Sequence, residues 1–287
     1  MTRTIARQHP SYRDDIADLV TRRPLPGQKV SQVDPFLFLN HHGPQTYRPG
    51  NNGLPFGPHP HRGFETVTFI LDGSLAHHDT GGHESIIEAG GVQWMTAGSG
   101  LVHAELSPAA FKREGGDMEI LQLWVNLPSK LKMTEPRYTG VQADGIPKIQ
   151  VADGEGTLHL VSGEFGDQSG PVDSLTDVFM SWVELKEGAS ITLPAPAARN
   201  IFFYLVSGAA EVAGTEIKEW YLVEFNGDGD DVTLTAKSDC RFLFGHADPI
   251  GEPVVAHGPF VMNTHQEINE AIRDYQAGKF DRQPMNL

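Results

Sequence analysis

Two stretches of the sequence decide the fold: Gly57–Gly73 reads GPHPHRGFETVTFILDG, and Gly90–Glu105 reads GGVQWMTAGSGLVHAE. Each joins short runs of β-branched and aromatic residues to glycine-rich turns, a pattern typical of β-strands. The run from Phe64 to Leu71 closes on an Asp72-Gly73 turn, and further strands are expected at residues 74–78, 85–88, 92–96, 101–106 and 118–127. Short strands at this density predict an all-β sandwich or barrel.

Composition and charge exclude several classes of protein. The chain has 287 residues, and Asp and Glu (37) outnumber Lys and Arg (22), for a formal net charge of −15. An acidic surface disfavours direct nucleic-acid binding and anionic membranes, because both need a basic face. A single cysteine, Cys240, excludes zinc-ribbon and CxxC sites and fits a reducing compartment, so a cytoplasmic protein is expected. No apolar run is long enough to span a membrane.

An internal repeat predicts two similar domains. The segment FETVTFILDG ends at Gly73 and RNIFFYLVSG ends at Gly208, an offset of 208 − 73 = 135 residues. We therefore expect two tandem β-barrels, at 1–135 and 145–287, separated by a strand-poor stretch. A capping box at Thr264 and Glu267, followed by apolar residues at helical spacing, predicts a C-terminal helix that Gly278 ends.

Two pairs of potential metal ligands lie at alternate positions. His59 and His61 precede the first strand, and His103 and Glu105 lie in a later one. Residues i and i+2 of a strand point to the same face, so each pair can face one interior. If the two strands are neighbours, three imidazoles and one carboxylate converge. That donor set suits iron, copper, manganese, nickel, cobalt or zinc.

The quoted stretches resemble the pirin family of the cupin superfamily. The resemblance extends to DPFLFLNHHGP (34–44), LQLWVNLP (121–128) and HGPFVMNT (257–264), and covers nearly the whole chain. It implies a bicupin, in which one chain forms two β-barrels and the N-terminal barrel holds one mononuclear metal site. The implied ligands are His59, His61, His103 and Glu105.

Glu65 is the alternative carboxylate ligand. Cupins in general place a glutamate three or four residues after the H-x-H pair, and Glu65 lies four residues after His61 on the same face if the strand is regular. Pirins resemble this sequence in using the later glutamate, so Glu65 is expected to support the site. In the second repeat the 135-residue offset aligns Pro194 and Pro196 with the first two histidines, which predicts a metal-free C-terminal barrel.

The resemblance also implies a reaction, the cleavage of flavonols such as quercetin at the 2,3 bond with O₂. Iron(II) is the expected metal, with Cu, Mn, Ni, Co or Zn as alternatives. Glu105 is expected to act both as ligand and as the base that takes the proton of the flavonol 3-hydroxyl. Phe56 and Gln122 are expected to contact the substrate at the mouth of the barrel.

Two other functions fit the same sequence. Animal pirins are described as iron-dependent cofactors of transcription regulators, which implies an interaction module or redox sensor with a protein partner. The third alternative is a cupin with a purely structural metal. A monomer is expected in each case, without direct nucleic-acid binding.

Overall fold

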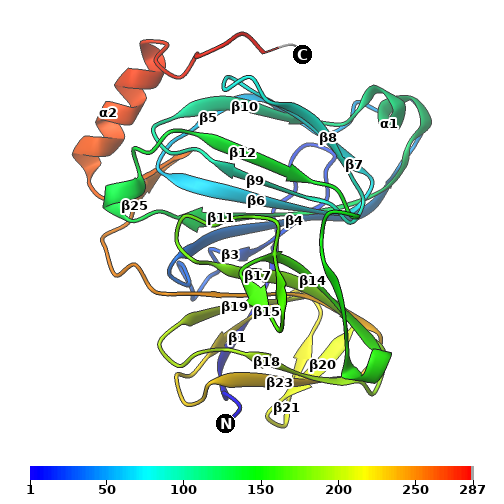
Figure 1. Ribbon diagram of the computed structural model, residues 1–287. Coiled ribbons are helices and arrows are strands. Elements are labelled where there is room, and N and C mark those ends of the chain that lie inside the picture. Colours follow the sequence, from blue (N-terminus) through cyan, green and yellow to red (C-terminus); the bar gives the residue numbers. More distant parts are fainter. Residues whose placement is uncertain (286–287) are drawn as a thin grey trace. The chain divides into compact units, whose positions relative to one another are not determined.

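The computed structural model describes residues 1–285, and these are mostly β-strands with two short α-helices (Figure 1). The chain divides into two compact units. The first barrel comprises residues 13–22, 38–143 and the chain from Ile250 onwards, and the second barrel comprises residues 1–12, 23–37 and 144–249. The all-β prediction with a C-terminal helix is confirmed.

The units differ from the predicted ranges 1–135 and 145–287 at both ends of the chain. The N-terminal strand β1 (Ile5–Pro10) pairs with β22 (Tyr221–Phe225), so the beginning of the chain belongs to the second barrel. The C-terminal helix α2 (His265–Gln276) belongs to the first barrel, where Ile268 packs with Val102 and Phe260. Local sequence patterns could not reveal this exchange, because it depends on long-range pairing.

Two sheets build the first barrel. The four-stranded sheet has the order β5-β10-β7-β8, with bounds β5 (Phe56–His61), β10 (Leu101–Leu106), β7 (Ser74–Asp79) and β8 (Glu84–Glu88). A seven-stranded sheet has the order β12-β9-β6-β11-β4-β3-β2, with bounds β12 (Arg137–Val141), β9 (Val92–Thr96), β6 (Phe64–Asp72), β11 (Gly116–Asn126), β4 (Phe36–Tyr47), β3 (Thr21–Leu25) and β2 (Tyr12–Arg13). The predicted strands at 92–96 and 101–106 are confirmed to the residue.

The chain changes sheet between His61 and Phe64. Strand β5 ends at His61 in one sheet, and β6 begins at Phe64 in the other. Gly63 makes the turn with φ +91°, and a Cβ there would lie 2.0 Å from the carbonyl oxygen of Val261. Only glycine fits such a left-handed, crowded position without a shift of the backbone. The alternation of side chains is therefore not continuous from His61 into β6.

The C-terminal segment completes the first barrel. A hairpin of β25 (Val255–His257) and β26 (Phe260–Met262) leads into α2, which begins with the predicted Thr264–Glu267 capping box. The other α-helix is α1 (Ala109–Glu114), and a 3₁₀ turn covers Ser129–Leu131. Within residues 1–285, neither α-helix is long and apolar enough to cross a membrane.

The second barrel repeats this plan. Its seven-stranded sheet has the order β1-β22-β19-β24-β17-β14-β13, with β19 (Asn200–Ser207), β24 (Cys240–Ala247), β17 (Phe179–Leu185), β14 (Gly156–Ser162) and β13 (Lys148–Val151). Its four-stranded sheet has the order β18-β23-β20-β21, with β18 (Ser190–Pro194), β23 (Asp231–Ala236), β20 (Ala209–Val212) and β21 (Thr215–Lys218). A small hairpin, β15 (Glu164–Phe165) and β16 (Gln168–Ser169), and a 3₁₀ turn at Ala152–Gly154 complete it.

Candidate metal centre

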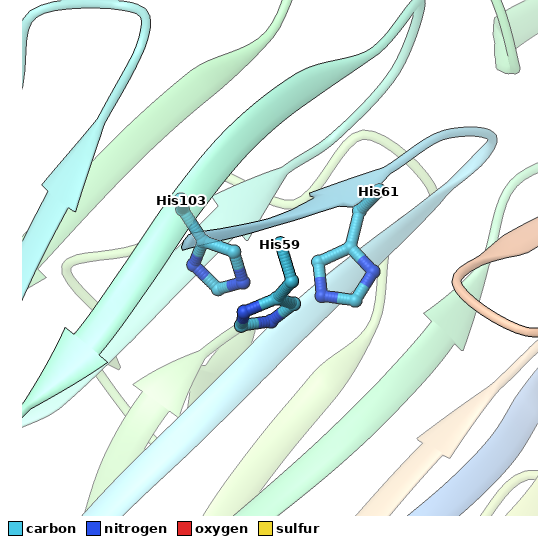
Figure 2. Close-up of side chains that lie close together, drawn as sticks. All are labelled: His59, His61 and His103. Atoms are coloured by element: carbon cyan, nitrogen blue, oxygen red, sulfur yellow. The ribbon is translucent and has the colours of Figure 1, made fainter. Parts of the chain in front are cut away.

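Three histidines from two paired strands meet in the first barrel. Strands β5 and β10 are antiparallel, and their register places His103 opposite His59 and Leu101 opposite His61. The three rings face one another in Figure 2, with centroids 4.3 to 4.9 Å apart. One ring nitrogen of each lies within 4.8 Å of the others, which is ligand spacing for a metal ion.

Backbone carbonyls fix which ring nitrogen faces the centre. His59 Nδ1 lies 2.8 Å from the carbonyl oxygen of Gly57, and His61 Nδ1 lies 3.3 Å from that of Pro259. A carbonyl oxygen only accepts, so each Nδ1 carries the proton and Nε2 keeps its lone pair. Metal-binding histidines are commonly held in this way through the second nitrogen.

The other ring nitrogens of His61 and His103 are buried without a hydrogen-bond partner. Among the described residues, none bonds to His61 Nε2 or to either nitrogen of His103. Buried polar atoms without partners are costly, so native proteins rarely retain them without a reason. A metal ion at this point would occupy the lone pair of His61 Nε2 and the one lone pair of the neutral His103 ring, and the donor set therefore fits one.

Burial keeps the imidazoles of His61 and His103 neutral. Desolvation, with a smaller contribution from His59, lowers the pKa of His61 to about 3. Burial also holds the pKa of His103 well below its usual value, assisted by the neighbouring histidines. A neutral imidazole is the form that binds a metal, so His61 and His103 need to lose no proton near pH 7.

Glu105 lies on the same strand as His103 but outside the triad. Its carboxylate is 2% exposed and accepts hydrogen bonds from Gln93 Nε2, from Gln122 Nε2 at 2.6 Å and from Thr68 Oγ1 at 3.3 Å. Strand β10 pairs it with Phe56 on β5 across a register shift. The structure thus brings together His59, His61 and His103, while the role of Glu105 as fourth ligand and base stays a prediction.

A polar network behind Glu105 was not visible in the sequence. The hydroxyl of Tyr138 lies 3.2 Å from Gln93 Oε1 and also bonds to Ser85. Because Tyr138 can donate to that oxygen, the amide NH₂ of Gln93 is turned toward Glu105. Tyr138 lies on β12, inside the stretch predicted to be strand-poor, and its ring stacks on His77 at 4.1 Å.

His77 is the member of the His77–His78 pair that enters the barrel. It is fully buried, and its Nε2 lies 2.9 Å from a carboxylate oxygen of Asp79. Its ring centroid is 5.5 Å from that of His103. His78 remains partly exposed, as expected for adjacent residues of one strand.

The alternative carboxylate, Glu65, points away from the triad. It is buried, but its Oε1 accepts a hydrogen bond from Thr96 at 2.6 Å, and burial raises its pKa. The face of β6 that is opposite to Glu65 carries Phe64 and Thr68. On that face the Phe64 ring is 5.1 Å from the His61 ring, and Thr68 donates a hydrogen bond to Glu105. The sheet change at Gly63 accounts for this. It interrupts the alternation of side chains between β5 and β6, so Glu65 does not point to the same side as His61.

The two predicted substrate contacts both adjoin Glu105. Phe56 is half-buried at the start of β5, and its ring lies 5.2 Å from that of His42. Gln122 is also half-buried and donates to Glu105 Oε2. Both positions are compatible with a contact to a bound molecule, and their role toward substrate stays a prediction.

A buried lysine ties the turn after His61 to its surroundings. Lys132 is 1% exposed, and its Nζ donates to the carbonyl oxygen of Gly63 at 2.9 Å, to Asn126 Oδ1 at 2.7 Å and to the carbonyl oxygen of Val261 at 3.0 Å. All three ammonium protons are thereby used. Lys132 connects β11, β26 and the sheet change next to the triad.

Replacing Lys132 with methionine should lower the free energy of unfolding by about 3 kcal/mol. Methionine fills a similar volume, but three buried acceptors lose their donor. Denaturant unfolding of the metal-free protein measures the change. Lys130→Met is the matched control, because Lys130 is exposed and its replacement should cost less than about 0.5 kcal/mol. Equal stability of the two variants would contradict a stabilising role for the three hydrogen bonds of Lys132.

Comparisons with known proteins identify the family of the chain. The sequence profile of the pirin family matches residues 18–125, and that of the pirin C-terminal cupin domain matches residues 180–281. Pirin from Rattus norvegicus is 38% identical over 264 residues, covering 90% of this chain and 86% of the rat protein.

Two solved structures share the fold. The crystal structure of a quercetin 2,3-dioxygenase from Acinetobacter baumannii superposes with a TM-score of 0.93 at 33% identity, covering 98% of this chain and 99% of that one. The bacterial pirin YhhW from Escherichia coli, in complex with nickel(II), has a TM-score of 0.67 at 20% identity, covering 85% and 99%. The chain therefore belongs to the pirin family of cupin proteins, and it carries a histidine triad suited to a metal centre.

Proposed function

We propose that this chain is a metal-dependent dioxygenase that opens flavonols such as quercetin at the 2,3 bond with O₂. The observation that carries the proposal is the set of buried, unpartnered ring nitrogens on His61 and His103, which face His59. The likeness to the A. baumannii quercetin 2,3-dioxygenase supports the choice of substrate class.

His59, His61 and His103 would hold the metal, with Glu105 proposed as the fourth ligand. The proposed ion is iron(II), which when bound would supply Lewis-acid and redox chemistry toward the flavonol oxygen and O₂. The overall reaction balances without a further reductant: one flavonol and one O₂ give one depside and one carbon monoxide.

Glu105 is proposed to take the proton of the flavonol 3-hydroxyl. Its carboxylate is buried two residues after His103, so a substrate oxygen near the triad would also lie near this base. The amides of Gln93 and Gln122 hold both carboxylate oxygens in place. Tyr138 fixes the Gln93 amide in turn, which makes Gln93 and Tyr138 positioning residues.

Half-buried side chains near Glu105 are proposed to receive the flavonol rings. Gln122 and Trp124 alternate on β11 and pair with Thr68 and Thr66 of β6. The Trp124 ring lies 5.4 Å from that of His61. Together with Phe56 they would offer aromatic faces to a planar substrate and one amide for its hydroxyl groups.

The test is aerobic incubation of the full-length protein with quercetin after chelation and reloading with each of the six candidate ions. The proposal expects loss of flavonol absorbance with at least one ion, and carbon monoxide release equal to O₂ uptake. Luteolin, which lacks the 3-hydroxyl group, is the matched control and should stay intact. A protein that binds the ion and leaves quercetin unchanged would contradict the proposed dioxygenase activity and favour a structural or protein-interaction role.

A further inference from the structure

The second barrel has a cavity of about 490 Å³, separate from the metal centre. Its wall includes residues of the segment 162–179, the prolines Pro194 and Pro196, and the side chains of Arg199 and His246. The two prolines are the residues that the 135-residue offset aligns with His59 and His61. The cavity therefore lies at the position in the second barrel that corresponds to His59 and His61 in the first barrel.

Strand pairing supports this equivalence. In the first barrel Trp124 of β11 pairs with Thr66 of β6. In the second barrel His246 of β24 pairs with Ile201 of β19, and Thr66 and Ile201 are 201 − 66 = 135 residues apart. His246 thus takes the place that Trp124 has beside the triad.

The aromatic stack at this place is also repeated. Phe38 stacks on Trp124 with ring centroids 4.6 Å apart, and Phe179 stacks on His246 at 4.8 Å with the planes within 8°. Both Phe179 and His246 line the cavity. An aromatic wall is therefore kept in the second barrel.

The metal ligands themselves are not kept. By the 135-residue offset His59 corresponds to Pro194, which β18 pairs with Asp231 of β23, whereas β5 pairs His59 with His103 of β10. The Asp231 carboxylate accepts a hydrogen bond from the N-terminal ammonium group at 3.1 Å. The neighbouring pairs of β18 and β23 are apolar, Leu193 with Val232 and Ile191 with Leu234. These four side chains are buried in the apolar core. The cavity therefore offers a ligand aromatic and polar groups without a metal.

Two polar atoms at the cavity are buried and make no hydrogen bond. His246 is 6% exposed, and within the described chain its Nδ1 has no hydrogen-bond partner; the same holds for Arg199 Nε. The other nitrogens of Arg199 are used, since Nη1 lies 3.0 Å from Asp177 Oδ2 and Nη2 donates to the carbonyl oxygens of Asp177 and His246. Arg199 Nε also lies 3.8 Å from Asp248 Oδ1, an ion pair that is too long for a hydrogen bond. One ring nitrogen and one N–H donor therefore remain for a hydrogen bond to a ligand.

Charge selects a neutral ligand. Asp177 and Asp248 pair with Arg199, and Glu164 and Asp173 also line the cavity, so an anion would be repelled. An ammonium group has no lone pair to accept a hydrogen bond from Arg199 Nε and would lie against the guanidinium, so a cation cannot satisfy this donor. Burial lowers the pKa of His246 to about 3, so its ring is neutral near pH 7.

We propose that this cavity binds a small neutral hydroxyaromatic molecule, whose ring packs beside Phe179 and His246 and whose hydroxyl groups bond to Arg199 Nε and His246 Nδ1. The Nε–H donates to one hydroxyl oxygen, and the His246 nitrogen bonds to a second hydroxyl group. A phenol with two separated hydroxyl groups satisfies both atoms at once.

Resorcinol is the probe, because its hydroxyl groups are not adjacent and it is a poor metal chelator. Binding to the metal-free, full-length protein is followed by NMR shifts of residues that line the cavity. We expect saturable binding with a Kd below about 1 mM. Benzoate and benzylamine, the anionic and cationic counterparts, should bind at least about tenfold more weakly.

His246→Phe keeps the ring stack and removes the ring nitrogens, so it should weaken resorcinol binding about tenfold. The matched control His265→Phe changes an exposed histidine on α2 and should bind as the wild type does. Several outcomes would overturn the proposal: no saturable shifts at these residues up to about 10 mM, tighter binding of benzoate or benzylamine, or full affinity in His246→Phe. None of these bears on quercetin turnover, which is tested separately.

Discussion

Replacing His103 with alanine is expected to abolish metal binding at the triad and quercetin turnover with it. His103 lies opposite His59 across β5 and β10, and both of its ring nitrogens are buried without a partner. Loss of a group that only supports a ligand commonly costs 10- to 100-fold in metal affinity, so loss of a ligand should cost at least about 100-fold. Elemental analysis and turnover of the same preparation measure both effects.

Stability separates a lost ligand from a damaged fold. A bound ion should raise the melting temperature of the wild type, because it binds the folded state. The His103→Ala variant should melt at the same temperature with and without the ion. The control is His78→Ala, on the neighbouring strand β7, because His78 is partly exposed. A His103→Ala variant that retains one tightly bound ion would show that the triad is not the metal site.

The second large effect is expected at Glu105. Glu105→Gln should lower quercetin turnover by about 10²- to 10⁴-fold, since an amide cannot take the proton of the 3-hydroxyl. The new amide group would also meet the NH₂ of Gln93 or Gln122, which already point at this position. Turnover is therefore compared at equal metal content, and the melting temperature of each preparation is recorded.

Glu65→Gln is the matched control for that variant. Glu65 is as deeply buried as Glu105, but its carboxylate is bonded to Thr96. A glutamine oxygen can accept the same bond, so turnover should stay within about threefold of the wild type, a small effect on the barrier. Full turnover in Glu105→Gln, together with loss of turnover in Glu65→Gln, would show that Glu65 is the base and Glu105 is not.

The triad was predictable because its geometry is local in each strand. Alternation alone put His59 and His61 on one face, and the glycine-rich turns marked the ends of β9 and β10. The convergence of the two strands needed only the assumption that they are neighbours, which their pairing confirms.

The surroundings of the triad were not predictable, because they depend on distant pairing. Strand β12 carries Tyr138 in a stretch with Pro136 and Gly140, and it forms only because β9 offers an edge for pairing. Lys132 reads as a surface charge until the carbonyl groups of Gly63 and Val261 surround it.

The expectation that Glu65 lies on the same face as His59 and His61 was wrong for a related reason. A strict two-residue alternation holds within one strand, and the turn at Gly63 separates two strands of different sheets. The sequence showed the glycine but not which sheet the chain joined after it. The same limit applies to the exchange of chain ends between the barrels, since β1 and α2 are placed by their partners.

Anomalous X-ray diffraction from crystals of the metal-loaded, full-length protein tests the central claim most directly. We predict one strong anomalous peak per chain, about 2.0–2.2 Å from a ring nitrogen of each of His59, His61 and His103. A peak at any other group of residues, or no peak in protein that elemental analysis shows to hold the ion, would contradict it.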